Sequence, residues 1–480
     1  MDDGSAPKPD VGPGDGIDDD IKQASTLKVS EERGHVGDTL TLKGVNLPRD
    51  REVKVVWNSV RGMWGVRRSN KVLGPQYEPR KDRIYTTVTG DSSTFKMDWT
   101  VQEDFGGEHV LELRTGDDVE LDSTTFTIDP HFELDRTEAP VGDRFRLTGY
   151  GLGPDPISTN YQVTWDNGYV GFVTGVQNHG TATAEIRAAG PPGEHVLRVW
   201  RNPTGVPFLQ NDTQSPYGHI TGGRQTTWTV TVTGRDDAPP TAEMEEMWPE
   251  DPVEAHLPDA GAESDAELSV EPSSGKPGTD AIITGREFPA GATVDLVWHT
   301  HGGQQAAGDP VRPEPRSGVL PTVEADEDGS FQVDVEIPSD IGATRPITAE
   351  VDGRSVAVSG FMLQPDIVDV SPTEGPVSTQ IDVELAGLGW PLYENNYYVL
   401  YDNRPVGYVA SNLADEDGIV RFNVEAAGPP GYHFIDVVPS FNDTDADDFE
   451  FDHKPHLSYL DNHPVRALPG MHFTFEVTEE

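Results

Sequence analysis

The chain has 480 residues, with 83 Asp and Glu against 35 Lys and Arg, and no cysteine. Its formal charge of −48 argues against nucleic acid as a general partner, because most of the surface would repel a phosphate backbone. The lack of cysteine excludes disulfides, thiolate metal sites and a cysteine nucleophile. No apolar run approaches the roughly 18 residues that span a bilayer.

Residues 1–24 are rich in Asp, Gly and Pro and predict a disordered acidic tether. The N-terminus lacks the basic and apolar regions of a signal peptide. Either the protein never crosses a membrane by the standard route, or this is a mature form whose signal has been removed. We favour the second interpretation, because such tethers often follow an export signal or lipid anchor, and expect an extracellular or cell-surface location.

Residues 25–128 predict a first all-β domain, A. Segments such as 39–42 and 53–57 alternate apolar and polar residues with a period of two, which indicates β-strands. Gly, Pro, Asn and Asp separate such segments, as in antiparallel β-sandwiches.

A basic segment at residues 59–83 has seven basic and two acidic residues, a local charge of +5. We predict a loop that docks on an acidic partner, such as an anionic glycan or the acidic surface of another copy. The alternative is a solvated loop without a partner. The candidate contact residues are Arg61, Trp64, Arg67, Arg68, Lys71, Arg80 and Lys81.

Residues 129–233 predict a second domain, B, with a long excursion at residues 201–225 before its last strand. Asn211 begins an Asn-Asp-Thr sequon, which would be glycosylated if the protein is exported by a cell with that pathway. Loops this long are usually binding surfaces or disordered. Phe208 and Tyr217 are its candidate ligand residues, because aromatic rings suit stacking on sugars or contact with proteins.

Residues 234–266 predict an acidic linker, with 11 Asp or Glu and one Arg in 33 residues. Its own charge repulsion would extend it, so we expect the two halves of the chain to fold separately. Met244, Met247 and Trp248 lie in this linker and either dock on a neighbouring domain or are exposed.

The second half of the chain repeats the first. At an offset of 241, Gly34 aligns with Gly275 and Trp57 with Trp298. At an offset of 236, Asp166-Asn167 aligns with Asp402-Asn403. Residues 267–363 therefore predict a domain A′, and residues 364–480 a domain B′.

B′ has its own late excursion, residues 439–470, with a sequon at Asn442 and ligand candidates Phe451 and Tyr459. His453 and His456 match no strong metal template, so we predict no metal site. Calcium is the ion that acidic runs such as 326–329 would suit, but that run lies where a hairpin turn is expected, and turn chemistry explains it. No other cofactor is predicted.

A histidine precedes a predicted strand in three domains, at His109, His195 and His433. The position is shared by domains that otherwise differ. We therefore interpret these histidines as features of the fold rather than of a site.

The opening of A′ resembles that of IPT/TIG-type immunoglobulin-like domains of microbial exported proteins. The resemblance lies in Leu268-x-Val270-x-Pro272-x-x-Gly275-x-x-Gly278-Thr279 followed by Ile283-Thr284-Gly285-x-x-Phe288-Pro289. It recurs more weakly at residues 27–48, 134–152 and 369–388. It implies four tandem immunoglobulin-like antiparallel β-sandwiches and brings no catalytic residues.

Catalytic motifs are absent: there is no Gly-x-Ser-x-Gly elbow, phosphate-binding loop or His-Glu-x-x-His. We expect a non-enzymatic extracellular or cell-surface structural or adhesive protein. Its expected partners are other surface or structural proteins, further copies of itself, or glycans. The alternatives are a virion or sheath component and a carbohydrate-binding accessory protein.

Lysine supplies only 10 of the 35 basic residues. An acidic surface poor in lysine is typical of proteins from high-salt environments. A high-GC genome combined with an acidic function is the alternative explanation.

Overall fold

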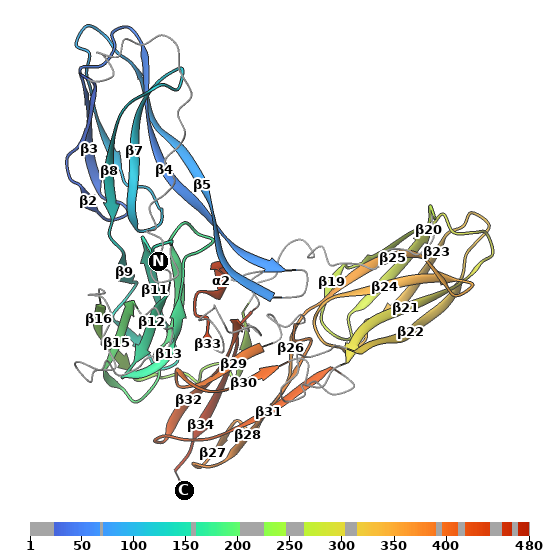
Figure 1. Cartoon of the computed structure of the whole chain (residues 1–480). Coiled ribbons are helices and arrows are strands. Elements are labelled where there is room, and N and C mark those ends of the chain that lie inside the picture. Colours follow the sequence, from blue (N-terminus) through green and yellow to red (C-terminus); the bar gives the residue numbers. More distant parts are fainter. Residues whose placement is uncertain are drawn as a thin grey trace.

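The computed structural model describes residues 24–67, 71–154, 160–201, 225–245, 264–302, 314–389, 396–410, 418–441, 454–462 and 469–479. These residues form β-strands almost throughout, with a short helix, α2 (Tyr459–Asn462), so the all-β prediction is confirmed. A, B, A′ and B′ each contribute one three-stranded sheet and one larger sheet (Figure 1). No helix in the described part of the chain is long and apolar enough to cross a membrane.

A and A′ share one strand order. The sheets of A are β1 (Thr26–Val29), β3 (Thr39–Val45), β6 (Phe95–Thr100), and β2 (Arg33–Gly34), β8 (Glu120–Ile128), β7 (Gly107–Thr115), β4 (Glu52–Arg67), β5 (Lys71–Val88). The sheets of A′ are β18 (Glu267–Glu271), β20 (Asp280–Arg286), β23 (Phe331–Glu336), and β19 (Ser274–Gly275), β25 (Arg354–Leu363), β24 (Ala343–Val351), β21 (Thr293–Gly302), β22 (Glu314–Glu324).

B and B′ repeat this plan. The sheets of B are β14 (Ala182–Arg187), β11 (Arg144–Tyr150), β9 (His131–Leu134), and β10 (Glu138–Pro140), β16 (Gln225–Thr233), β15 (Gly193–Arg201), β12 (Tyr161–Trp165), β13 (Gly168–Val173). The sheets of B′ are β26 (Asp366–Ser371), β28 (Gln380–Ala386), β31 (Ile419–Glu425), and β17 (Ala242–Met244), β34 (Met471–Val477), β32 (Gly431–Phe441), β29 (Asn396–Tyr401), β30 (Arg404–Ala410). β27 (Glu374–Gly375) pairs with β34, and β33 (Lys454–Pro455) with β32.

Alternating strands fill each core from both sheets. In β3, Leu40 and Leu42 are buried while Thr39 and Lys43 are exposed. Each of the aligned tryptophans donates to a buried aspartate: Nε1 of Trp57 to Asp104 and Nε1 of Trp298 to Asp340, both over 2.7 Å. The duplication therefore extends to the polar chemistry of the core.

A meets B as A′ meets B′. The amide of Gly106 donates to the Leu152 carbonyl over 3.1 Å, and that of Gly342 to the Leu388 carbonyl over 2.5 Å. A Cβ on either glycine would lie 2.0 Å from a carbonyl oxygen of the neighbouring sandwich, so both contacts require glycine.

The basic segment of A is not a loop. Residues 52–67 and 71–88 form one long antiparallel hairpin, β4–β5, which extends beyond the sandwich toward B′ (Figure 1). The predicted loop is therefore corrected. Cross-strand pairing continues through Gly62, Gly65 and Pro75, with register shifts near Val55 and Gly65.

Candidate functional site: the junction between B and B′

B and B′ share one apolar core. Val163 and Trp165 of B belong to the same buried cluster as Leu400, Phe434 and Val438 of B′. The expectation that the two halves fold separately is therefore wrong. Burial of apolar area across this junction holds residues far apart in sequence together.

The beginning of the expected linker is part of B′. Residues 242–244 form β17, which pairs antiparallel with β34, and Met244 packs against the core of B′. Of the two alternatives for Met244, the structure shows docking on a neighbouring domain, and the extended linker is corrected for these residues. Met247 and Trp248 lie outside the described residues.

An ion pair crosses the junction. Arg187, the last residue of β14, meets Asp436 in the middle of β32, and both are buried. Nε of Arg187 donates to both oxygens of Asp436, over 3.1 and 2.9 Å, and Nη2 also donates to this carboxylate. Nη1 donates to the Gly142 carbonyl over 2.8 Å, and the guanidinium lies 4.9 Å from the Phe434 ring centre.

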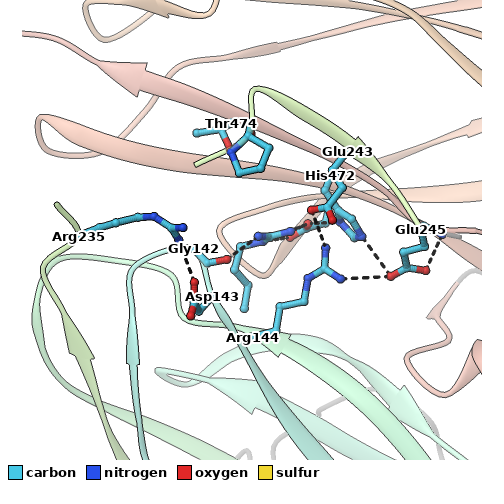
Figure 2. A network of polar contacts seen from close by, with 12 residues as sticks. Gly142, Asp143, Arg144, Arg235, Glu243, Glu245, His472 and Thr474 are labelled. Atoms are coloured by element: carbon cyan, nitrogen blue, oxygen red, sulfur yellow. Dashed lines mark hydrogen bonds and ion pairs between the residues drawn. The ribbon is translucent and has the colours of Figure 1, made fainter. Parts of the chain in front are cut away.

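His472 and Glu245 extend the network of polar contacts beyond this ion pair (Figure 2). Nδ1 of His472 lies 2.6 Å from a carboxylate oxygen of Asp436, and Nε2 lies 3.1 Å from one of Glu245. His472 therefore bridges the two carboxylates. Glu245 also accepts from the Tyr459 hydroxyl over 2.6 Å and from the Gly470 amide over 2.8 Å.

Arg144 closes the network from the side of B. Its Nη1 lies 3.4 Å from Glu245, and its Nη2 lies 3.9 Å from Glu243. The network thus joins B, the strand β17 and B′. Asp436 and Glu245, the two carboxylates with little exposed area, each meet an arginine and His472, which offsets the cost of burying their charge, whereas Glu243 is exposed.

The network shifts the ionisation of its carboxyl groups. Burial by itself raises the pKa of Asp436, but Arg187 and His472 outweigh it and hold that pKa below its ordinary range. Burial likewise opposes ionisation of Glu245, but hydrogen bonds from His472, Tyr459 and Gly470 lower its pKa overall. Both side chains are therefore ionised at neutral pH.

The spaces beside the network do not suit a substrate. The cavity between Arg187, Asp436 and Tyr459 holds about 30 Å³, roughly the volume of one water molecule. A neighbouring cleft of about 260 Å³ has three arginines in its wall. Each of them already has a carboxylate partner, including Asp143 for Arg235 at 2.8 Å, so the cleft has no surplus positive charge. We call Arg187, Asp436, His472, Glu245 and Arg144 the clamp, because their contacts hold B and B′ together.

A segment of B′ covers the open side of B. His456 forms a parallel bridge with Phe172 of β13, and the Leu457 amide donates to the Phe172 carbonyl over 2.8 Å. Leu457 and Tyr459 enter the shared core. The Ser458 hydroxyl accepts a hydrogen bond from the Thr174 amide over 3.0 Å and donates one to the Thr174 carbonyl over 2.9 Å.

The hairpin of A reaches this same segment. Trp64 is buried, and its Nε1 donates to the Asn462 carbonyl at the end of α2 over 2.5 Å. Arg80 pairs with Asp82 and Asp104, and Lys81 with Glu112. Trp64, Arg80 and Lys81 therefore have partners within the chain, which corrects their assignment to an external partner.

The remaining residues of the basic segment are only partly described. Arg61 is exposed on β4. Arg67 and Lys71 pair in the backbone ladder at the hairpin end, and Arg68 lies outside the described residues. Arg61 and the tip of the hairpin thus stay predicted partner contacts.

Tyr459 is buried in the junction, so its role as a ligand-loop residue is corrected. The other ligand and sequon candidates lie outside the described residues, namely Phe208, Tyr217, Phe451, Asn211 and Asn442. Within the described part of the chain, no three His, Asp or Glu side chains are grouped to hold a metal ion. Asp326 accepts from the amides of Asp328 and Ser330, as expected of a turn.

The three repeated histidines are fold features, as predicted. Nδ1 of His195 and of His433 meets Asp166 and Asp402 respectively, each over 2.6 Å. The second ring nitrogen of each bonds to a backbone carbonyl over 2.8 Å. His109 differs only at Nδ1, which meets the Asn58 carbonyl over 3.1 Å. All three rings stack on an aligned aromatic residue, namely Trp57, Trp165 and Tyr401.

Sequence reasoning did not find Arg187, Asp436, His472 or Glu245. One signal was present: Asp436 and His472 interrupt otherwise apolar runs, Phe434 to Val438 and Met471 to Phe473. A charge within a buried strand indicates a buried partner.

No family model and no curated protein matches the chain. Among solved structures, Salmonella alpha-2-macroglobulin is similar at 10% identity over 95% of this chain and 31% of that one, with a TM-score of 0.18. The chain thus spans about a third of that protein. A Yersinia pseudotuberculosis adhesin has 13% identity over 47% of this chain and 66% of that one, with a TM-score of 0.18.

A Bacillus subtilis sporulation control protein has 9% identity over 43% of this chain and 89% of that one, with a TM-score of 0.16. Likenesses at such TM-scores carry no argument about activity.

Proposed function

We infer that the protein is a non-enzymatic structural or adhesive component of a cell surface or its surroundings. In this function B and B′ form one rigid body that carries A and A′ as arms. The observation that carries the inference is the locked junction, with its shared core and the buried contact between Arg187 and Asp436. A scaffold needs fixed geometry, whereas a string of independent spacers does not.

Several further features support this function. A and A′ project from the B–B′ body in different directions (Figure 1). The contacts at Gly106 and Gly342 attach both arms in the same way. The acidic, lysine-poor composition suits a surface hydrated in salt water, and the IPT/TIG-type resemblance is to exported proteins.

Protease treatment of intact cells of the source organism tests the location. The full-length protein is expected to be degraded while a cytoplasmic control protein survives. Protection of the protein until the cells are lysed would overturn the proposal.

A strain that lacks the protein tests the role. It is expected to attach less to surfaces or to neighbouring cells, or to show an altered envelope. Normal attachment together with a normal envelope would contradict a structural or adhesive function.

A further inference from the structure

The last strands of the larger sheets of B and B′, β13 and β30, are duplicates of each other but have different surroundings. At the offset of 236, Val170, Gly171, Phe172 and Val173 of β13 align with Val406, Gly407, Tyr408 and Val409 of β30. Each strand is the last of its sheet among the described residues. The duplication thus supplies an internal comparison.

In B this edge is covered. Val170 and Phe172 are 2% and 0% exposed, and the ring of His456 stacks on Phe172 with centres 4.9 Å apart. A Cβ on Gly171 would lie 2.6 Å from the Pro455 carbonyl oxygen. The glycine therefore lets the covering backbone approach the strand.

In B′ the same edge is open. Val406 and Tyr408 are 56% and 46% exposed. A Cβ on Gly407 would meet no atom within 4 Å. Beside the strand lies a groove of about 330 Å³, with Val399, Tyr401, Phe422 and Val424 in its wall.

The equivalent wall of B is a closed core. Trp165 is 4% exposed and shares a cluster with Leu457 and Tyr459, whereas the aligned Tyr401 is only partly buried. Val163 and the aligned Val399 are both buried. The groove of B′ thus has the residues of a filled site, and no segment among the described residues covers it as Pro455 to Tyr459 cover the edge of B.

We propose that the groove between β30 and β31 is a docking site for an extended peptide segment of a partner protein. The segment is non-acidic and carries an aliphatic and an aromatic residue two positions apart, as Leu457 and Tyr459 do. Its backbone donates to the edge of β30, in the way that the Leu457 amide donates to β13. A non-acidic segment suits a chain with a charge of −48.

The inference rests on the duplicated edges and not on the proposed function. Its probe is the chain's own covering segment, a fluorescent peptide with the sequence of residues 454–460. The peptide is titrated into the full chain, and fluorescence anisotropy measures binding. Saturable binding is expected, whereas a peptide with Leu457→Ser and Tyr459→Ser is expected not to bind.

Gly407→Val locates the binding. The new side chain has free space in the open groove but blocks a docked backbone, so affinity is expected to fall at least about tenfold. Gly318→Val is the matched control, because Gly318 is also an exposed strand glycine with no atom within 4 Å of a Cβ. Both variants should unfold at the temperature of the parent chain.

Two results would overturn the proposal. The first is no saturable binding to the parent chain. The second is binding that Gly407→Val leaves unchanged.

Discussion

Arg187 and Asp436 are buried, and each finds its opposite charge on the other half of the molecule. Breaking one member of such a pair is costly because the other charge stays buried. Removal of either side chain is therefore expected to destabilise the junction.

Asp436→Ala is expected to cost about 3–5 kcal/mol of unfolding free energy. Urea denaturation of the full chain measures it. Glu384→Ala is the control, because it breaks a pair with Arg421 at 2.8 Å that is largely exposed, and should cost under about 1 kcal/mol. Equal losses in the two variants would contradict the clamp.

The junction is also expected to weaken in acid. Asp436 and Glu245 have lower pKa values in the folded chain than when unfolded, so their stabilisation is complete above about pH 4–5 and is lost as the pH falls. Urea midpoints between pH 3 and pH 7 measure the effect. In Asp436→Asn the slope should be shallower, and an unchanged slope would refute the assignment.

At the scale of elements, the β4–β5 hairpin joins the first sandwich to the last. Its contact is Trp64 against the end of α2, the segment that also covers B. Residues 456–462 of B′ therefore contact A through Trp64 and B through Phe172.

Trp64→Ala is expected to remove that contact and to lower the free energy of unfolding by about 2 kcal/mol, the size typical of a buried tryptophan at an interface. Hydrogen exchange should become faster in residues 454–462. Arg61→Ala, an exposed change on the same strand, should stay within about 0.5 kcal/mol of the parent. Unchanged exchange in Trp64→Ala would show that the contact is dispensable.

The hairpin tip carries a separate prediction. Changing Arg67, Arg68 and Lys71 to Glu is expected to weaken self-association, because the tip would then repel the acidic body of another copy. Light scattering at low salt measures the mass. An unchanged mass would leave the tip without this role.

At the scale of the whole molecule, the junction makes the two halves one body despite the long connection between them. A protease site placed within residues 246–263 tests this. After cleavage the halves are expected to co-elute in size-exclusion chromatography, whereas Arg187→Glu should let them separate because it places like charges opposite Asp436. Separation of the cleaved parent chain would refute the rigid body.

Local pattern was enough to predict the sandwiches. Alternation with a period of two marks strands wherever it occurs, and the repeated Asp166-Asn167 and Asp402-Asn403 turns have positive φ at both residues, as tight hairpins require. The duplication could also be predicted from the sequence. Aligned residues such as Trp57 and Trp298 do make the same hydrogen bond to a buried aspartate.

The junction between B and B′ could not be predicted from local sequence patterns. The partners Arg187 and Asp436 lie 249 positions apart, and nothing local to either names the other. Likewise, the basic segment looked free because its carboxylate partners Asp104 and Glu112 come from elsewhere in A. Sequence alone thus determines which segments become strands, since that depends on near neighbours. Which charges are buried, and which of two duplicate edges is covered, depends on contacts that exist only once the chain has folded.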